Sequence, residues 1–195
     1  MGKIFYIMGK SAAGKDRIYS CLVSDKQLGL RKLVLYTTRP IRSGEENGRE
    51  YFFTDDRKLR ELESQGRVIE ARTYHTVQGI WTYFTADDGQ VNLETSDYLG
   101  IGTLESFIKL KQYYGEHKVV PIYIEVENGE RLTRALEREK MQKNPGYAEM
   151  CRRFLADEED FSEENIQKAG IKRRFRNIDL LICIEEIVKY IKSVQ

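Results

Sequence analysis

Eight residues near the start of the chain have the spacing of a loop that binds phosphate groups. The segment from Gly9 to Asp16 matches the pattern G-x-x-x-x-G-K-[ST] except at its last position. Such loops follow a strand and open a helix, so their backbone N–H groups and the helix dipole face phosphate oxygens. The apolar segment Ile4–Met8 supplies the preceding strand, which favours this interpretation over an ordinary glycine-rich turn. The residues expected to cradle the phosphates of a nucleotide are Gly9, Lys10, Ser11, Ala12, Ala13, Gly14, Lys15 and Asp16, and Lys15 would reach the β- and γ-phosphates.

Asp16 stands where this pattern usually has a serine or threonine hydroxyl that contacts magnesium. A carboxylate is also a good hard-oxygen ligand for Mg²⁺, directly or through water, so Asp16 is the candidate metal ligand. Its negative charge beside phosphates should make the site more dependent on the metal. Arg17, the next residue, could neutralise part of that charge.

A second cluster of phosphate-binding chemistry lies between Tyr36 and Tyr51. Arg39 and Arg42 can each present a planar fork to phosphate oxygens, and Tyr51 can add a hydroxyl donor. The pair Asn47-Gly48 predicts a turn that would fold Tyr51 back toward the arginines. Alone, such a loop is more often a surface network of salt bridges. Beside a phosphate loop it becomes a candidate site for a second, phosphorylated substrate.

Composition limits the classes of partner. The chain has 195 residues, 32% of them charged, with a net charge of only +1, so its charge gives no argument for nucleic acid or an anionic membrane. No apolar run approaches the length of a membrane span, and we expect no signal peptide. The three cysteines Cys21, Cys151 and Cys183 are far apart, which favours reduced thiols in the cytoplasm over a disulfide framework or a zinc site.

Short apolar runs alternate with segments of helical spacing, and this alternation around a phosphate loop predicts a three-layer α/β fold with a parallel core sheet. The expected strands are Ile4–Met8, Lys32–Leu35, Arg67–Thr73, Trp81–Thr85, Tyr98–Ile101, Val119–Val126 and Leu180–Ile184. The expected helices are Lys15–Ser24, Arg57–Gln65, Leu104–Tyr114, Gly129–Met141, Gly146–Glu159 and Glu185–Ser193.

The chain resembles the guanylate kinase family. The phosphate loop, the run T-T-R-x-x-R-x-G-E-x-N-G-x-x-Y that ends at Tyr51, and the pair Ile69-Glu70 follow in the order and spacing of that family. The resemblance covers most of the chain and weakens after Glu70. It implies a P-loop NTPase three-layer fold with an inserted acceptor-binding lobe and a helical lid. The implied division is a core of residues 1–34, 86–126 and 160–195, an acceptor-binding lobe of 35–85 and a lid of 127–159.

The resemblance also implies a reaction, the transfer of the γ-phosphoryl group of ATP to GMP with Mg²⁺. The partners would then be small-molecule nucleotides, and the enzyme would be a monomer or a homodimer. By motif position, Arg39, Arg42 and Tyr51 would hold the acceptor phosphate, while Glu45 would order that lobe or its water network. Glu70 would accept hydrogen bonds from guanine N1 and the N2 amine, because a buried carboxylate can accept from both. The other interpretation of Glu70 is a surface charge at the end of a strand.

Arginines of the implied lid would close over the phosphates of donor and acceptor. Arg134 and Arg138 lie four residues apart on one expected helix and therefore share a face, and Arg152 and Arg153 follow on the next. The best matches to the family are Arg134, Arg138 and Arg153, which would stabilise charge on the transferring group and exclude water. The alternative is a solvated helix in which the arginines pair with Glu130, Glu137 and Glu139.

The chain departs from the family where guanine would be read. Leu35 replaces a usual serine near guanine O6, and Gly100 and Gly102 replace a usual pair of acidic residues. A second polar contact to the base is therefore absent, unless Asp97 or Glu105 substitutes.

The family's tyrosine-rich segment and its lid also differ. Tyr83 would supply a phenol to the acceptor phosphate, one place from its usual position. Trp81 could stack on a base or pack inside the lobe. The lid is about four residues longer than usual, through Lys140–Tyr147.

Three functions follow from these observations. The first is an ATP-dependent guanylate kinase-like enzyme that needs no covalent intermediate. The second is a related phosphotransferase acting on another phosphorylated acceptor, which the altered base contacts favour. The third is a non-catalytic binding module, against which Lys15 and the two loop glycines argue.

Overall fold

Five parallel strands form the central sheet of the computed structural model, which describes residues 2–76 and 79–195. The order across the sheet is β2-β7-β1-β8-β9. The strands are β1 (Ile4–Met8), β2 (Arg31–Lys32), β7 (Tyr98–Ile101), β8 (Val119–Glu125) and β9 (Arg174–Arg176). Every residue of β1 is buried, as expected for a central strand covered on both faces.

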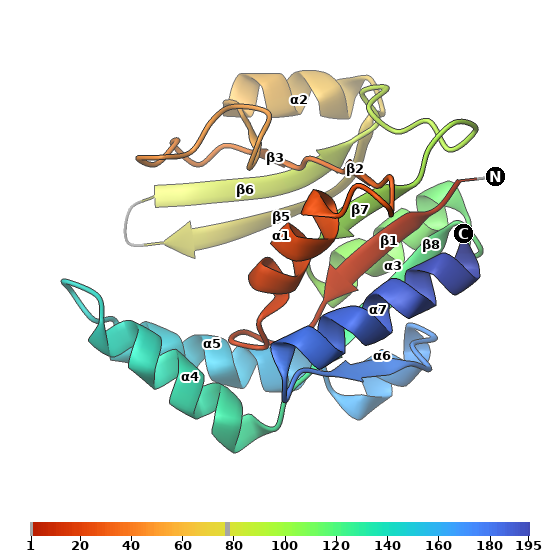
Figure 1. The fold of residues 1–195 in the computed structure, drawn as a ribbon. Helices are drawn as coiled ribbons and strands as arrows, with labels where there is room; N and C mark the ends of the chain where they lie inside the picture. Colours follow the sequence, from red (N-terminus) through yellow and green to blue (C-terminus); the bar gives the residue numbers. More distant parts are fainter. Residues whose placement is uncertain (1, 77–78) are drawn as a thin grey trace.

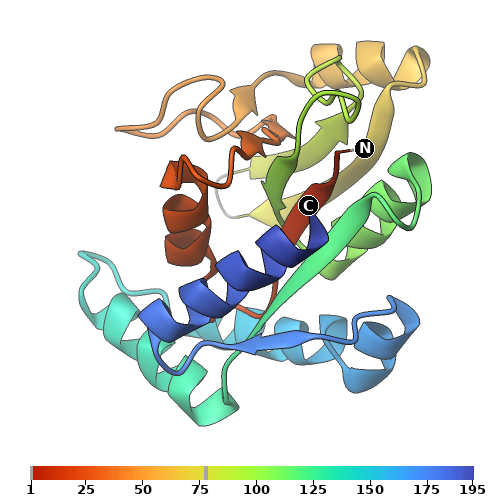
Figure 2. The ribbon, with the colours of Figure 1, turned by 45° about the vertical axis from the view of Figure 1, so that its right-hand side comes forward.

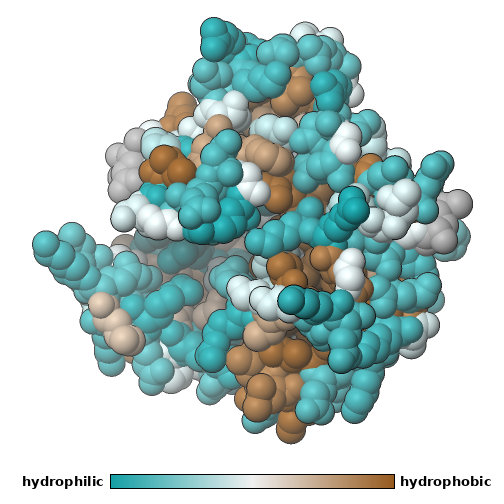
Figure 3. Space-filling model, turned by 45° about the horizontal axis from the view of Figure 1, so that its top comes forward, coloured by the Kyte–Doolittle hydropathy of each residue, from teal (hydrophilic) through white to brown (hydrophobic). Residues whose placement is uncertain are grey.

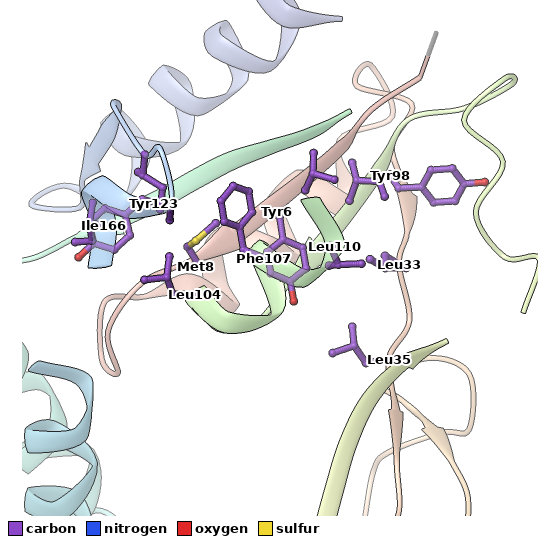
Figure 4. Packing of buried hydrophobic residues seen from close by; sticks show 14 of the residues in the cluster. Tyr6, Met8, Leu33, Leu35, Tyr98, Leu104, Phe107, Leu110, Tyr123 and Ile166 are labelled. Atoms are coloured by element: carbon purple, nitrogen blue, oxygen red, sulfur yellow. The ribbon is translucent and has the colours of Figure 1, made fainter. Parts of the chain in front are cut away.

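Helices cover both faces of this sheet (Figures 1 and 2). They are α1 (Lys15–Ser24), α3 (Leu104–Tyr114), α6 (Glu163–Lys168) and α7 (Leu180–Val194). Alternate residues of β1 point to opposite faces, so Tyr6 packs with residues of α3 and α6, and Phe5 with residues of α1 and α7. Figure 4 shows the first cluster, with Tyr6 of β1 between Phe107 and Leu110 of α3. The three-layer α/β fold with a parallel core sheet is therefore confirmed.

A second sheet lies above the first (Figure 1). Within the described residues its strands run in the order β4-β3-β6-β5. They are β3 (Tyr36–Thr37), β4 (Phe52–Phe53), β5 (Val68–Thr76) and β6 (Gly79–Ala86), accompanied by helix α2 (Asp56–Ser64). Leu59 and Leu62, on one face of α2, pack against Phe84 and Ala86 in a small separate core.

Two long helices extend beyond the C-terminal edge of the central sheet, α4 (Asn128–Lys140) and α5 (Tyr147–Asp160). They pack against each other and lie below the second sheet in the view of Figure 1. Figure 3 shows the surface hollowed between this helical pair and the second sheet, with a mainly hydrophilic rim. Among the described helices, none combines the length and the apolar character that crossing a membrane requires.

Two strand predictions are wrong. The segment Lys32–Leu35 is not one strand, because the chain passes there from β2 in the central sheet to β3 in the second. The segment Leu180–Ile184 belongs to helix α7, whose first N–H groups are capped by the Asp179 carboxylate. Short apolar runs do not distinguish strands from buried helices. The last strand is instead β9, a segment in which only Phe175 is buried.

Candidate active site

The phosphate loop joins β1 to α1 at the C-terminal edge of the central sheet. Gly9 and Gly14 both have positive φ angles, 147° and 87°, which glycine adopts without strain. A Cβ at Gly9 would also overlap the carbonyl oxygen of Ile124, so this position has room only for hydrogen. Ala12 takes a left-handed φ of 61°, an uncommon conformation for a residue with a side chain. Strained backbone of this kind gathers at binding sites.

Helix α1 presents an uncapped N-terminus to this loop. Gly14 is its N-cap, and no side-chain hydrogen bond caps the helix within the described chain. The half-buried Lys15 crosses the loop and donates to the backbone oxygen of Lys10 at 2.9 Å. Burial lowers the pKa of Lys15, against the charges of Asp16 and Asp157. Free N–H groups, the helix dipole and a lysine are the features that bind phosphate.

An ionic cluster that the sequence did not reveal anchors this loop to α4 and α5. The Arg131 side chain is only 1% exposed, and its Nε donates to the Ser11 oxygen at 3.0 Å. Its terminal nitrogens bind Asp157 and Glu158 at 3.2 and 2.7 Å. Asp157 in turn accepts from the Ser11 N–H at 2.7 Å, and Glu158 binds Lys10 at 2.8 Å. The cluster therefore fixes the loop on one side.

Asn177 anchors the loop on its other side. Its Nδ2 donates to the Ala13 oxygen at 2.8 Å and occupies the space that a side chain at Gly14 would need. Arg134 on α4 donates to the backbone oxygen of Asn177 at 3.2 Å and pairs with Glu130 at 2.7 Å. Arg134 is thus held beside the phosphate loop.

The other lid arginines differ in how they are engaged. Arg153 lies near the buried carboxylate of Glu139 at 3.6 Å, and Arg152 pairs with Glu149. Arg138 is exposed, and its side chain forms no hydrogen bond or ion pair with the residues that the structure describes. Its charge lies close enough to Lys15 to contribute to the lowered pKa of that residue. Arg138 is therefore the lid arginine most available to a ligand.

Four of the residues predicted for the acceptor site lie together in the second sheet and its loop. Arg39 is 3% exposed and forms a two-pronged ion pair with Glu45, at 2.8 and 2.9 Å. This hydrogen-bonded pair lowers the pKa of Glu45 to about 2. Arg39 lies 5.4 Å from the ring centre of Tyr51, and Tyr51 lies 5.5 Å from the ring of Tyr83. Arg39 Nε is buried without a hydrogen-bond partner among the described residues.

Arg42 completes this group from the exposed side of the loop. Its N–H donates to Glu45 at 2.8 Å, while its guanidinium lies 6.0 Å from the ring centre of Trp81. Trp81 is half-buried in β6. The predicted turn at Asn47-Gly48 does return Tyr51, since Gly48 donates to the Tyr51 oxygen at 2.8 Å. Both arginines therefore lie on one folded loop, where Glu45 holds the fork of Arg39 and the side chain of Arg42 is exposed.

Glu70 is placed inside the second sheet and not at its surface. Its side chain is 2% exposed and accepts from Thr85 at 2.7 Å and from Arg72 at 2.9 Å. The carboxylate of Glu70 raises the pKa of Arg72, although burial alone would lower it. Arg72 was not among the residues singled out in the sequence. The spacing of two along a strand, which puts both side chains on one face, was the available signal.

Tyr6 occupies the space beside Gly100, in β7, and Gly102, just after that strand. A Cβ at Gly100 would lie 2.7 Å from the Tyr6 ring, and one at Gly102 would overlap its hydroxyl. The hydroxyl shares a 2.7 Å hydrogen bond with Ser106, and burial raises the pKa of Tyr6. Asp97 does not substitute for the missing acids, because it lies at the other end of β7 and accepts from the Lys3 N–H.

The residues present could take a magnesium ion only together with a nucleotide. No group of three or more histidine, cysteine, aspartate or glutamate side chains suited to a metal occurs in the described part of the chain. Asp16 is an exposed carboxylate in the first turn of α1. Mg²⁺ commonly takes one or two carboxylates plus substrate phosphates and water, so this donor set fits.

Comparisons with known proteins agree with this geometry. A family model described as guanylate kinase matches residues 1–151. The guanylate kinase of Porphyromonas gingivalis is 28% identical over 198 aligned residues, which cover 98% of this chain and 97% of that protein. A guanylate kinase of Anaplasma phagocytophilum is 30% identical over 142 residues, 70% of this chain and 63% of that one. The crystal structure of guanylate kinase from Anaplasma phagocytophilum matches the fold with a TM-score of 0.66 at 20% identity, covering 100% of this chain and 86% of that chain.

Proposed function

Because this chain belongs to the guanylate kinase family, we propose that it transfers the γ-phosphoryl group of ATP to GMP, giving ADP and GDP. It is a nucleoside monophosphate kinase with the fold of that family. One arrangement carries the assignment of the donor site. The loop from Gly9 to Asp16 leads into the uncapped N-terminus of α1, and Lys15 crosses it to the backbone oxygen of Lys10 at 2.9 Å. Arg39, Tyr51 and Tyr83 form a second cluster of side chains suited to phosphate.

The reaction needs two phosphate groups held in line. An oxygen of the acceptor phosphate attacks the γ-phosphorus, and the bond to the β-phosphate oxygen breaks as ADP leaves. In our proposal, Lys15 and the loop N–H groups hold the donor phosphates, and Arg39, Arg42 and Tyr51 hold the acceptor phosphate. A magnesium ion bound with ATP near Asp16 would offset phosphate charge.

The lid arginines would supply the remaining positive charge. Arg138, the least engaged in this structure, would approach the transferring group first, with Arg134 and Arg153 following as the lid closes. Their present partners, Glu130 and Glu139, would be exchanged for phosphate oxygens. Closure would also exclude the water that would otherwise hydrolyse ATP.

The proposal includes the cellular compartment and the oligomeric state of the enzyme. All three cysteines are free, with Cys183 buried and the other two exposed, which supports a reducing compartment such as the cytoplasm. We propose that the enzyme acts there as a monomer or a homodimer.

A coupled assay of ADP release tests this function. ATP and Mg²⁺ are supplied with GMP, dGMP, AMP, CMP, UMP or a sugar phosphate. Strong turnover with GMP is expected, and Lys15→Ala should reduce it by at least about 100-fold because a preorganised charge is lost. Lys26→Ala, at an exposed lysine just past α1, is the matched control and should leave the rate unchanged.

Other results of this assay would separate the alternatives. Turnover with a sugar phosphate or another nucleotide in preference to GMP would move the acceptor assignment and keep the kinase. ATP binding without turnover of any acceptor would contradict the enzyme assignment and favour a binding module.

A further inference from the structure

Arg72 pairs with Glu70, the residue predicted to bind the base of the acceptor nucleotide. Leu35 is buried and apolar, and Gly100 and Gly102 carry no side chain, so these three positions offer a base no polar side-chain group. The charged pair in this region is Glu70 and the residue two places along β5, Arg72.

The free hydrogen-bond donors and acceptors of Glu70 and Arg72 determine which base edge this pair can bind. Glu70 Oε1 accepts a short hydrogen bond from Thr85 at 2.7 Å and a long one from Arg72 Nη2 at 3.5 Å, which together engage its lone pairs. Among the described residues Oε2 accepts only from Arg72 Nε, at 2.9 Å, and keeps one lone pair. The carboxylate can therefore accept one further hydrogen bond instead of two.

Arg72 has donors to spare. Its guanidinium has five N–H bonds, of which two point to Glu70 and one to Thr103 Oγ1 at 3.2 Å. Two donors have no partner among the described residues. The Arg72 side chain is 10% exposed, against 2% for Glu70, so Arg72 is the more accessible member of the pair. The pair thus offers a ligand donor groups next to a single acceptor.

We infer that Arg72 is a specificity-determining residue, and that this site reads the C6=O and N1–H edge shared by guanine and hypoxanthine. Arg72 donates to the O6 carbonyl, and Glu70 Oε2 accepts from N1–H. The N2 amino group of guanine finds no second carboxylate lone pair, because Thr85 and Arg72 already occupy Oε1. The substrate class is therefore the 6-oxopurine nucleoside monophosphates, with little preference for GMP over IMP. Adenine is rejected, since its N6 amino group would meet the donors of Arg72. This inference rests on the proposed kinase function.

The first test uses the wild-type enzyme, so it does not depend on any variant folding. We measure kcat/KM for GMP, IMP and AMP in the ADP-release assay at saturating ATP and Mg²⁺. A GMP-to-IMP ratio within about tenfold is expected, since one hydrogen bond in exchange for water is worth about that factor. AMP should be at least about 100-fold poorer than IMP. A GMP-to-IMP ratio above about 100, or AMP equal to IMP, would overturn the inference.

Variants of Arg72 then test the residue itself. Arg72→Ala frees Oε1 of Glu70, so the GMP-to-IMP ratio should rise while discrimination against AMP falls. Arg72→Lys keeps a cation beside the buried carboxylate but loses the fork, and it should shift both ratios in the same directions if Arg72→Ala does not fold. Ratios are informative because a merely structural defect would lower the rates with every nucleotide alike. Unchanged ratios in a folded variant would contradict the role of Arg72.

Two further measurements complete the design. Arg60→Ala, at an exposed arginine of α2 in the same lobe, is the matched control and should change neither ratio. Calorimetric binding of GMP, IMP and AMP gives ratios of Kd that do not depend on turnover. If no nucleotide supports turnover, the kinase proposal fails, yet equal Kd values for GMP and IMP would still support the reading by Arg72. A Kd for GMP more than about 100-fold below that for IMP would refute it.

Discussion

Removing Arg131 should destabilise the protein and loosen the phosphate loop together. In Arg131→Met the packing against the ring of Phe154, 4.7 Å from the guanidinium carbon, can be retained, but the charge is lost. Asp157 and Glu158 then remain without their partner in a partly buried site. Breaking a buried ion pair from one side costs roughly 3–5 kcal/mol.

The expected value lies at the lower end of that range. The Glu158 side chain is 34% exposed and also keeps Lys10, so water and a second cation relieve part of the loss. We expect about 3 kcal/mol, which corresponds to roughly 6–12 °C in Tm for a chain of this size. The lost bond to Ser11 should also raise KM for ATP more than it lowers kcat, because the loop binds the donor.

Thermal unfolding followed by circular dichroism, with KM for ATP from the ADP-release assay, measures both effects. Arg176→Met is the matched control, since its side chain is 79% exposed and its pair with Glu125 is 3.4 Å long. An exposed pair of this kind contributes at most about 1 kcal/mol. If Arg131→Met is no more destabilising than Arg176→Met, or if KM for ATP does not move, the argument that this cluster anchors the loop is refuted.

Three further predictions concern acid stability, packing and metal dependence. The folded pKa of Glu45 is lowered to about 2 from its usual 4.5, so its pair with Arg39 stabilises the fold above about pH 4.5, and this stabilisation is lost as pH falls toward 2. In acid unfolding, Glu45→Gln should therefore lack the loss of stability that the wild type shows between about pH 4.5 and 2. Gly102→Ala should cost about 1–3 kcal/mol in urea unfolding through overlap with Tyr6, and Tyr6→Phe in the same chain should recover part of it. Asp16→Ser should tighten binding of metal-free ATP about fivefold by calorimetry, since about 1 kcal/mol of charge repulsion is removed; an unchanged Kd would show that Asp16 does not face the phosphates.

Contacts between neighbours in sequence were predictable, and contacts between distant segments were not. The phosphate loop and the turn at Asn47-Gly48 are defined by consecutive residues whose backbone requirements are visible in their types. In the ionic cluster, Arg131 binds Ser11, 120 positions away, and Asp157, 26 positions away. No sequence pattern in one of these segments indicates that it contacts the others. The solvated-helix alternative for the lid was also partly correct, because Arg134 does pair with Glu130 in this structure. The functional roles given to the lid arginines remain predictions.

The packing of Tyr6 beside Gly100 and Gly102 illustrates why family membership predicts phosphate chemistry more firmly than the choice of base. Tyr6 fills the volume beside Gly100 and Gly102 and satisfies its hydroxyl with Ser106, so the core keeps its packing. Packing is what the fold requires of these positions, whereas polarity toward the cleft is what the base requires. The two requirements can change separately, because a buried aromatic ring can fill this volume without offering a base any hydrogen-bond acceptor such as a carboxylate. The phosphate loop allows no such exchange, since its backbone N–H groups serve both the turn and the ligand.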